Sequence, residues 1–119
     1  MGRLVPVVLD SSALLAAYFQ EPGGQLVEPQ LLGALISAVN LTEVVGVLTT
    51  RDYPKSEIDY MLAHMPVEVV PYSTPQAILA GEIIKITAEH GLSLGDRACL
   101  ALGLLMDATI LTADRAWRG

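Results

Sequence analysis

The sequence predicts an α/β protein in which a parallel sheet lies between two layers of helices. Four short apolar runs alternate with helix-like segments, and this βαβαβαβ order builds a parallel sheet covered on both faces. Apolar residues make up 52% of the chain and charged residues 17%, which excludes a disordered protein. A length of 119 residues suits one domain, and residues 1–119 are expected to form it.

Each predicted strand is a short apolar run bounded by residues that interrupt regular structure. Pro6 suits the first position of a strand, where no ladder donor is needed. Gly33 precedes the second run. Pro66 and Pro71 bound the third, and Asp107 turns the chain before the fourth. The strands are predicted at residues 7–10, 34–37, 67–70 and 109–112.

The predicted helices begin at short polar residues or at proline. Ser12, Asn40 and Ser93 are expected to act as N-caps, because their side chains can accept hydrogen bonds from unpaired helix N–H groups. Thr74-Pro75 is expected to start a long helix, since proline suits the first helical position. The helices are predicted at residues 12–19, 25–32, 40–50, 55–64, 74–90 and 93–106.

Four acidic residues occupy positions that a parallel sheet would bring together. Asp10 follows the first apolar run, and Asp114 comes two residues after the last. Glu43 and Asp96 stand near the starts of otherwise apolar helices. Ligands of open parallel sheets bind beyond the carboxyl ends of the strands, so these four acids are candidate site residues.

A plainer interpretation of two of these acids is helix capping. Glu43 follows Asn40 by three residues, and Asp96 follows Ser93 at the same spacing, as in a capping box. Taken singly, each acid is better explained as a cap than as a metal ligand. Capping does not explain the acids that follow two separate strands, and the coincidence of all four favours a shared site.

Converging carboxylates would repel one another unless they bound protons or cations, so the pattern predicts a metal centre. Carboxylate oxygens suit Mg²⁺ or Mn²⁺, and a single cysteine without paired histidines argues against zinc. A metal-activated water would then hydrolyse a phosphodiester. Supporting roles are expected for residues that orient the carboxylates or contact phosphate: Ser11, Ser12, Thr112, Arg97 and Arg115.

The charge and the N-terminus limit the possible partners and location. A net charge of −6 argues against broad electrostatic binding of nucleic acid, which normally requires a basic stripe. Asp10 interrupts the N-terminal apolar stretch before a secretory signal or membrane span is complete. The expected location is therefore the cytoplasm, with no membrane association.

With these residues in view, the chain resembles the PIN domain family, most closely the VapC-type ribonuclease toxins of toxin-antitoxin pairs. The resemblance covers essentially the whole chain and rests on four motifs, at residues 8–15, 38–44, 91–102 and 111–117. It implies a three-layer α/β/α PIN-like fold with a central parallel sheet of four to five strands. Family members continue to another strand, so the resemblance implies that a C-terminal strand is missing or trimmed after Gly119.

The resemblance also implies a site and an activity. Asp10, Glu43 and Asp96 correspond to the usual core of the Mg²⁺ or Mn²⁺ centre, and Asp114 to its more variable fourth member. The implied activity is endoribonuclease cleavage of single-stranded regions of RNA such as transfer or ribosomal RNA. A cognate antitoxin would inhibit it, and a homodimer is usual. The alternatives are a PIN-type nuclease in RNA processing and a catalytically silent protein-binding scaffold.

Overall fold

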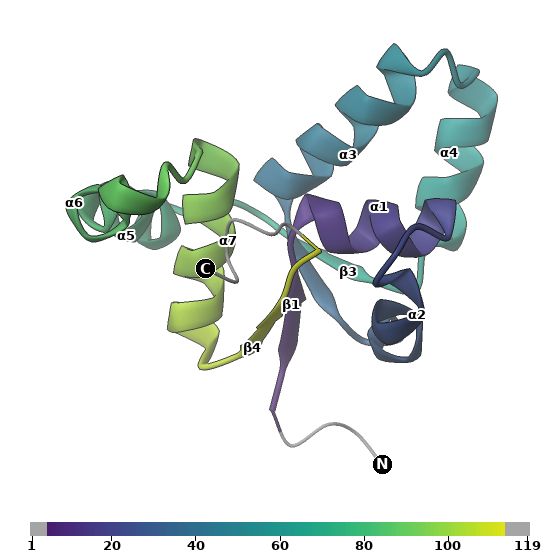
Figure 1. Ribbon diagram of the computed structural model, residues 1–119. Coiled ribbons are helices and arrows are strands. Elements are labelled where there is room, and N and C mark those ends of the chain that lie inside the picture. The colour runs from purple at the N-terminus through teal and green to yellow at the C-terminus, as the bar shows by residue number, and fades with distance from the viewer. Residues whose placement is uncertain (1–4, 114–119) are drawn as a thin grey trace.

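The computed structural model describes residues 5–113, which contain a sheet of four parallel strands (Figure 1). The strands lie in the order β3-β2-β1-β4, so the strand order reverses between β1 and β4. Each strand has three residues, and their bounds are Val7–Leu9 (β1), Leu35–Ser37 (β2), Glu68–Val70 (β3) and Thr109–Leu111 (β4).

Helices connect the strands and cover both faces of the sheet, with α1, α2 and α4 on one side and α5, α6 and α7 on the other (Figure 1). The two 3₁₀ helices, η1 and η2, follow α2 and α6. The bounds are Ser11–Phe19 (α1), Gly24–Val27 (α2), Glu28–Gln30 (η1), Ala38–Thr50 (α3), Lys55–His64 (α4), Thr74–Glu82 (α5), Ile84–Thr87 (α6), Ala88–His90 (η2) and Leu94–Met106 (α7).

The side chains of β1 alternate between two apolar cores, as the pleat of a strand requires. Val7 and Leu9 belong to the core that includes residues of α1, α3 and α4. Val8 packs in the second core with Cys99 and Leu102 of α7. Burial of β1 on both faces explains its uninterrupted apolar sequence. The predicted three-layer α/β/α fold with a parallel sheet is confirmed.

The register brings the carboxyl ends of three strands to one edge of the sheet. Leu9 of β1 pairs with Ile36 of β2 and with Leu111 of β4. The residues that follow these strands therefore emerge side by side, next to the reversal in strand order. In open α/β sheets this position is where ligands bind.

Two predicted helix caps are wrong by a few residues. Asp10, not Ser12, caps α1, because β1 ends at Leu9 and the Asp10 carboxylate accepts a hydrogen bond from the Ala13 N–H. Ser37, not Asn40, caps α3. In each case the residue that leaves the strand in an extended conformation is itself the cap, so no linker separates strand and helix. The Ser93 cap and its capping box with Asp96 are confirmed.

The helix predicted at 74–90 is divided into α5, α6 and η2, and its N-cap is Ser73. Arg97 of α7 donates a hydrogen bond from Nη1 to the backbone carbonyl of Ala80, at 2.9 Å. This bond satisfies a carbonyl near the end of α5 that the interrupted helix would otherwise expose. The helix predicted at 25–32 is likewise shorter, since α2 gives way to η1 around Pro29.

Among residues 5–113, no helix combines the length and the hydropathy that crossing a membrane requires.

Candidate metal centre

Asp10 lies at the carboxyl end of β1 and is only 2% exposed. Its Oδ1 accepts hydrogen bonds from the Ala13 N–H and the Ser12 hydroxyl, both at 2.8 Å. Its Oδ2 accepts a hydrogen bond from the Thr112 hydroxyl, just after β4. Groups from α1 and from the end of β4 therefore fix the orientation of this carboxylate.

Ser12 and Thr112 also join the two chain segments directly. Their hydroxyl oxygens lie 3.2 Å apart, and the Ala113 N–H donates to Ser12 Oγ at 3.0 Å. These bonds hold the end of β4 against the first turn of α1. The geometry suits the orienting role that the sequence suggests for both hydroxyls.

Glu43 projects from α3 toward the starts of α1 and α7. Its Oε1 accepts hydrogen bonds from Ser11 Oγ at 2.9 Å and from Asn40 Nδ2 at 3.0 Å. Both bonds go to this one oxygen, and within residues 5–113 Oε2 accepts no hydrogen bond and lies against Gly95. Ser11 orients Glu43, whereas Ser12 orients Asp10, and the two adjacent serines thus serve different carboxylates.

Asn40 contacts the candidate site, and its expected role as the N-cap of α3 is wrong. It is 1% exposed, and Nδ2 also donates to the backbone carbonyl of Gly95 at 3.0 Å. Its Oδ1 is buried without a hydrogen-bond partner in the described part of the chain. The amide therefore ties α3 and Glu43 to the first turn of α7. The available signal was an asparagine in an otherwise apolar helix, which capping seemed to explain.

Gly95 is a second contributor that the sequence analysis did not single out. It lies in the first turn of α7, and a methyl group at this position would lie 2.6 Å from the carboxyl carbon of Glu43. With glycine at this position the carboxylate lies against the backbone of α7, and any side chain here would displace it. The partial positive charge at the N-terminus of α7 favours an anion there.

Asp96 follows Gly95 and forms the predicted capping box. Its Oδ2 accepts a hydrogen bond from the Ser93 N–H at 2.9 Å, and its own N–H donates to Ser93 Oγ at 3.2 Å. The side chain is half-buried, and among the described residues Oδ1 has no hydrogen-bond donor. One oxygen can thus cap the helix while the other remains available to a ligand.

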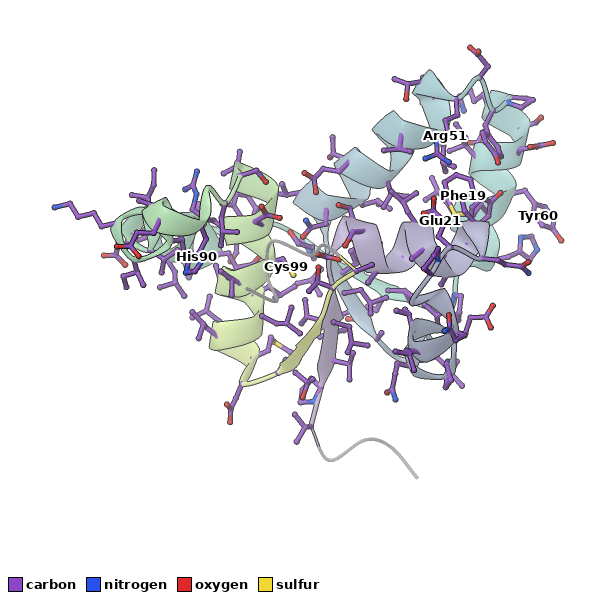
Figure 2. The ribbon with its side chains drawn as sticks, in the orientation of Figure 1. Phe19, Glu21, Arg51, Tyr60, His90 and Cys99 are labelled. Atoms are coloured by element: carbon purple, nitrogen blue, oxygen red, sulfur yellow. The ribbon has the colours of Figure 1, made fainter. Side chains whose placement is uncertain are left out.

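The charges of the candidate acids affect the pKa values of two buried groups, Asp10 and Cys99. Burial raises the pKa of Asp10, the negative charge of Asp96 adds to this effect, and the hydrogen bonds to Asp10 oppose it. Burial also raises the pKa of the Cys99 thiol, with further contributions from Asp10, Asp96 and Glu43. Cys99 lies on α7 where this helix packs on the sheet (Figure 2). Three carboxylates thus create a negative potential around one end of β1.

The donor chemistry of this region fits Mg²⁺ or Mn²⁺, which prefer carboxylate and water oxygens. Across residues 5–113, no three His, Cys, Asp or Glu side chains already form a group that could hold a metal ion. Mg²⁺ usually retains several waters and binds through one or two carboxylates, so it does not need such a group. Cys99 is buried in the apolar core and is not part of the donor set.

The structure describes the surroundings of Arg97 but not those of Asp114 and Arg115. Arg97 directs Nη1 to the Ala80 carbonyl on α5, and its Nε is buried without a partner in the described part of the chain. This placement supports packing of α5 on α7 rather than the expected contact with phosphate. Asp114 and Arg115 lie outside the described residues, so their roles stay predictions.

Asp10→Asn is expected to stabilise the metal-free protein at neutral pH. Because the pKa of Asp10 is raised in the folded state, the carboxyl contributes stability below its unfolded pKa of about 3.9. That contribution is lost as the pH rises through the folded pKa. Thermal unfolding in EDTA should therefore give the variant a higher Tm at pH 7, with the advantage shrinking toward pH 4.

Asparagine can still accept the capping hydrogen bond from Ala13, so the variant keeps its N-cap. Adding Mn²⁺ should raise the Tm of the wild type and have little effect on Asp10→Asn. A variant that is less stable than the wild type at pH 7 without metal would contradict the prediction.

The class of protein is now defined: an α/β domain with an acidic site beside the reversal in its strand order. The sequence profile described as PIN domain matches residues 7–118. The chain therefore belongs to the PIN domain family, as its motifs predicted. No curated protein matches the chain by sequence.

Several solved structures share the fold at low sequence identity. A DNA-bound VapBC from Salmonella typhimurium superposes with a TM-score of 0.74 at 16% identity, covering 98% of this chain and 92% of that one. FitAcB from Neisseria gonorrhoeae gives 0.71 at 17% identity, with 92% and 88% covered. A toxin-antitoxin complex from Klebsiella pneumoniae gives 0.69 at 18% identity, with 92% and 87% covered.

Proposed function

We propose that this protein is a Mg²⁺- or Mn²⁺-dependent endoribonuclease that cleaves single-stranded regions of RNA and acts as the toxin of a toxin-antitoxin pair. The observation that carries the proposal is the arrangement of Asp10, Glu43 and Asp96 around the carboxyl end of β1 in a PIN-domain chain. Burial of the Asp10 carboxylate costs free energy, which a bound cation would offset.

In this proposal Asp10, Glu43 and Asp96 hold the divalent ion, with Asp114 as the predicted fourth ligand. When bound, the ion supplies an activated water and neutralises charge on the phosphodiester. Ser12 and Thr112 hold the Asp10 carboxylate in place. Because these orienting bonds exist before any ligand arrives, little reorganisation is needed during the reaction.

Digestion of total cellular RNA tests the enzymatic part of the proposal. The purified protein should cut RNA in Mg²⁺ or Mn²⁺ and leave it intact in EDTA, and sequencing of the new ends should locate the cuts. Transfer and ribosomal RNA are the expected targets. A well-folded protein that binds Mn²⁺ yet cuts no RNA would contradict the proposal, and one that binds no Mn²⁺ would favour the scaffold alternative.

The toxin assignment is supported by the VapC-type motifs of the sequence and by the neighbours described above, of which the Klebsiella structure is a toxin-antitoxin complex by name. A short reading frame next to this gene should encode the antitoxin. Expression of the protein alone should arrest growth, and co-expression with that frame should restore it. RNA cleavage without a growth defect would favour a role in RNA processing. We also expect one domain per chain and a homodimer, which light scattering can test.

An apolar groove between α1 and α4 supports binding of an antitoxin segment. Its volume is about 640 Å³, and its lining includes Leu14, Tyr18, Leu31, Tyr60, Met61 and Met65. Tyr60 is 67% exposed, and exposed aromatic side chains of this kind are typical of protein interfaces. We propose that an amphipathic segment of the antitoxin covers this groove.

Tyr60→Asp is expected to weaken antitoxin binding by at least about tenfold, because it places a charge in an apolar interface. The exposed position makes a loss of folding unexpected, and RNA cleavage by the free protein should be unchanged. Calorimetry with the purified antitoxin measures the first effect. Glu57→Gln, which changes a more polar side chain of the same groove, is the matched control. Equal affinities for the two variants would contradict the placement.

A further inference from the structure

A second groove lies along the seam between α1 and α3, close to the candidate metal centre. Its volume is about 360 Å³, and its lining includes Ser12, Ala113, Leu15, Val47, Glu21 and Arg51. The Ser12 hydroxyl donates to the Asp10 carboxylate and the Ala113 N–H donates to Ser12, so one end of the groove lies next to Asp10. The groove therefore offers a path for a ligand that extends beyond the reacting group.

Arg51 lies at the C-terminal end of α3, beside Phe19 and Glu21 (Figure 2). Its guanidinium carbon is 4.3 Å from the centroid of the Phe19 ring, a cation–π contact that limits the orientations of the guanidinium. Arg51 is eight residues after Glu43 on the same helix, which corresponds to roughly 12 Å along the axis. It therefore lies too far from the acids to contact the phosphate that is cut.

The other described cations have different surroundings. Lys55 pairs with Asp59 at 2.7 Å, and Arg97 donates to the Ala80 carbonyl. Lys85 lies on α6, on the opposite side of the sheet from α1 (Figure 1). In the described part of the chain, Arg51 is thus the cation that lines a groove leading from the acids. A chain of net charge −6 has few such groups with which to hold a polyanion.

The geometry points to a phosphate-binding subsite at Arg51 for the RNA strand that flanks the cleavage position. This inference rests on the proposed ribonuclease function and adds the path of the substrate. The strand lies along the α1/α3 groove, with the scissile phosphate at the acids and a flanking phosphate at the Arg51 guanidinium. The planar donors of arginine suit phosphate oxygens, and Phe19 keeps them oriented.

Glu21 lines the same groove and has the opposite effect on a phosphate. Its carboxylate repels the strand, so the balance between Glu21 and Arg51 sets the affinity of the subsite. Removal of the Arg51 charge should therefore weaken RNA binding, and removal of the Glu21 charge should strengthen it. A charge variant on another face of the molecule then separates a phosphate path from a general effect of net charge.

Cleavage kinetics of charge variants test the subsite, using a single-stranded RNA oligonucleotide that spans a cut mapped in total RNA. Arg51→Gln should raise KM roughly fivefold, the upper range for an exposed ion pair, with kcat little changed. The salt dependence of log(kcat/KM) should become less steep by about 0.7, the value for one phosphate contact on a single strand. Arg51→Lys should retain most of the affinity, and Glu21→Gln should lower KM.

Lys85→Gln is the matched control, because it removes the same charge from another face of the molecule. A dinucleotide substrate is a second control, since it is too short to reach Arg51 and should be cut equally by the wild type and Arg51→Gln. If Arg51→Gln behaves like Lys85→Gln while the wild type cuts RNA, the subsite is wrong and the ribonuclease function stands. If the wild type cuts no RNA with Mg²⁺ or Mn²⁺, the proposed function fails, and the subsite fails with it.

Discussion

Asp96→Asn is expected to reduce metal-dependent RNA cleavage by at least about a hundredfold, which corresponds to about 2.7 kcal/mol of transition-state stabilisation. The change removes the negative charge that a divalent ion would bind. Asparagine keeps an oxygen that can accept the capping hydrogen bond from the Ser93 N–H, so α7 should remain intact. Initial rates of RNA cleavage in Mn²⁺ measure the effect, and circular dichroism checks the fold.

Asp59→Asn is the matched control for this variant. Asp59 lies on α4, where its exposed carboxylate pairs with Lys55, and the same chemical change there should leave cleavage unchanged. Full activity in Asp96→Asn would exclude this carboxylate as a metal ligand. Such a result would leave capping as its sole role.

Gly95→Ala is expected to lower cleavage by roughly a hundredfold without unfolding the protein. The added methyl group would collide with the carboxylate of Glu43, which Ser11 and Asn40 hold against the first turn of α7. The flexible end of the glutamate can move aside, so the cost appears mainly in the position of the ligand. A displacement of about 1 Å can cost this much activity.

Gly46→Ala provides the comparison for Gly95→Ala. Gly46 lies on α3 close to Glu43, but a methyl group there would meet no atom within 4 Å. Alanine should stabilise this helix by up to about 1 kcal/mol and leave cleavage unchanged. Mn²⁺ affinity from calorimetry should fall only in Gly95→Ala. Equal affinity and activity in the two variants would show that Glu43 does not depend on the space at Gly95.

Short-range patterns explain why most elements were predictable from the chain. The apolar runs at β1 and β4, and the Ser93 capping box, are local features whose physical causes lie within a few residues. The sequence predicts a continuous helix at 74–90, whereas in the structure Arg97 of another helix bonds the Ala80 carbonyl near the end of α5. A contact between residues 17 positions apart leaves no periodic signal in the sequence.

Some residues of the candidate site could also be predicted from local patterns, whereas others could not. Its acids could be proposed from their positions after strands and at helix starts, because parallel strands bring such residues to one edge. Asn40 could not be assigned correctly, since its spacing to Glu43 fits a capping box equally well. Its actual bonds, to Glu43 and to the Gly95 carbonyl, depend on how α3 and α7 meet.

The sequence by itself determined the α/β class and the family and singled out the candidate acids, because strand burial, helix capping and family motifs are properties of neighbouring residues. The tertiary structure decided which groups orient those acids, which space Gly95 leaves for Glu43, and where the groove to Arg51 runs. These features depend on the packing of α1, α3 and α7 against one another. This packing involves residues far apart in the sequence, so local sequence patterns do not reveal it.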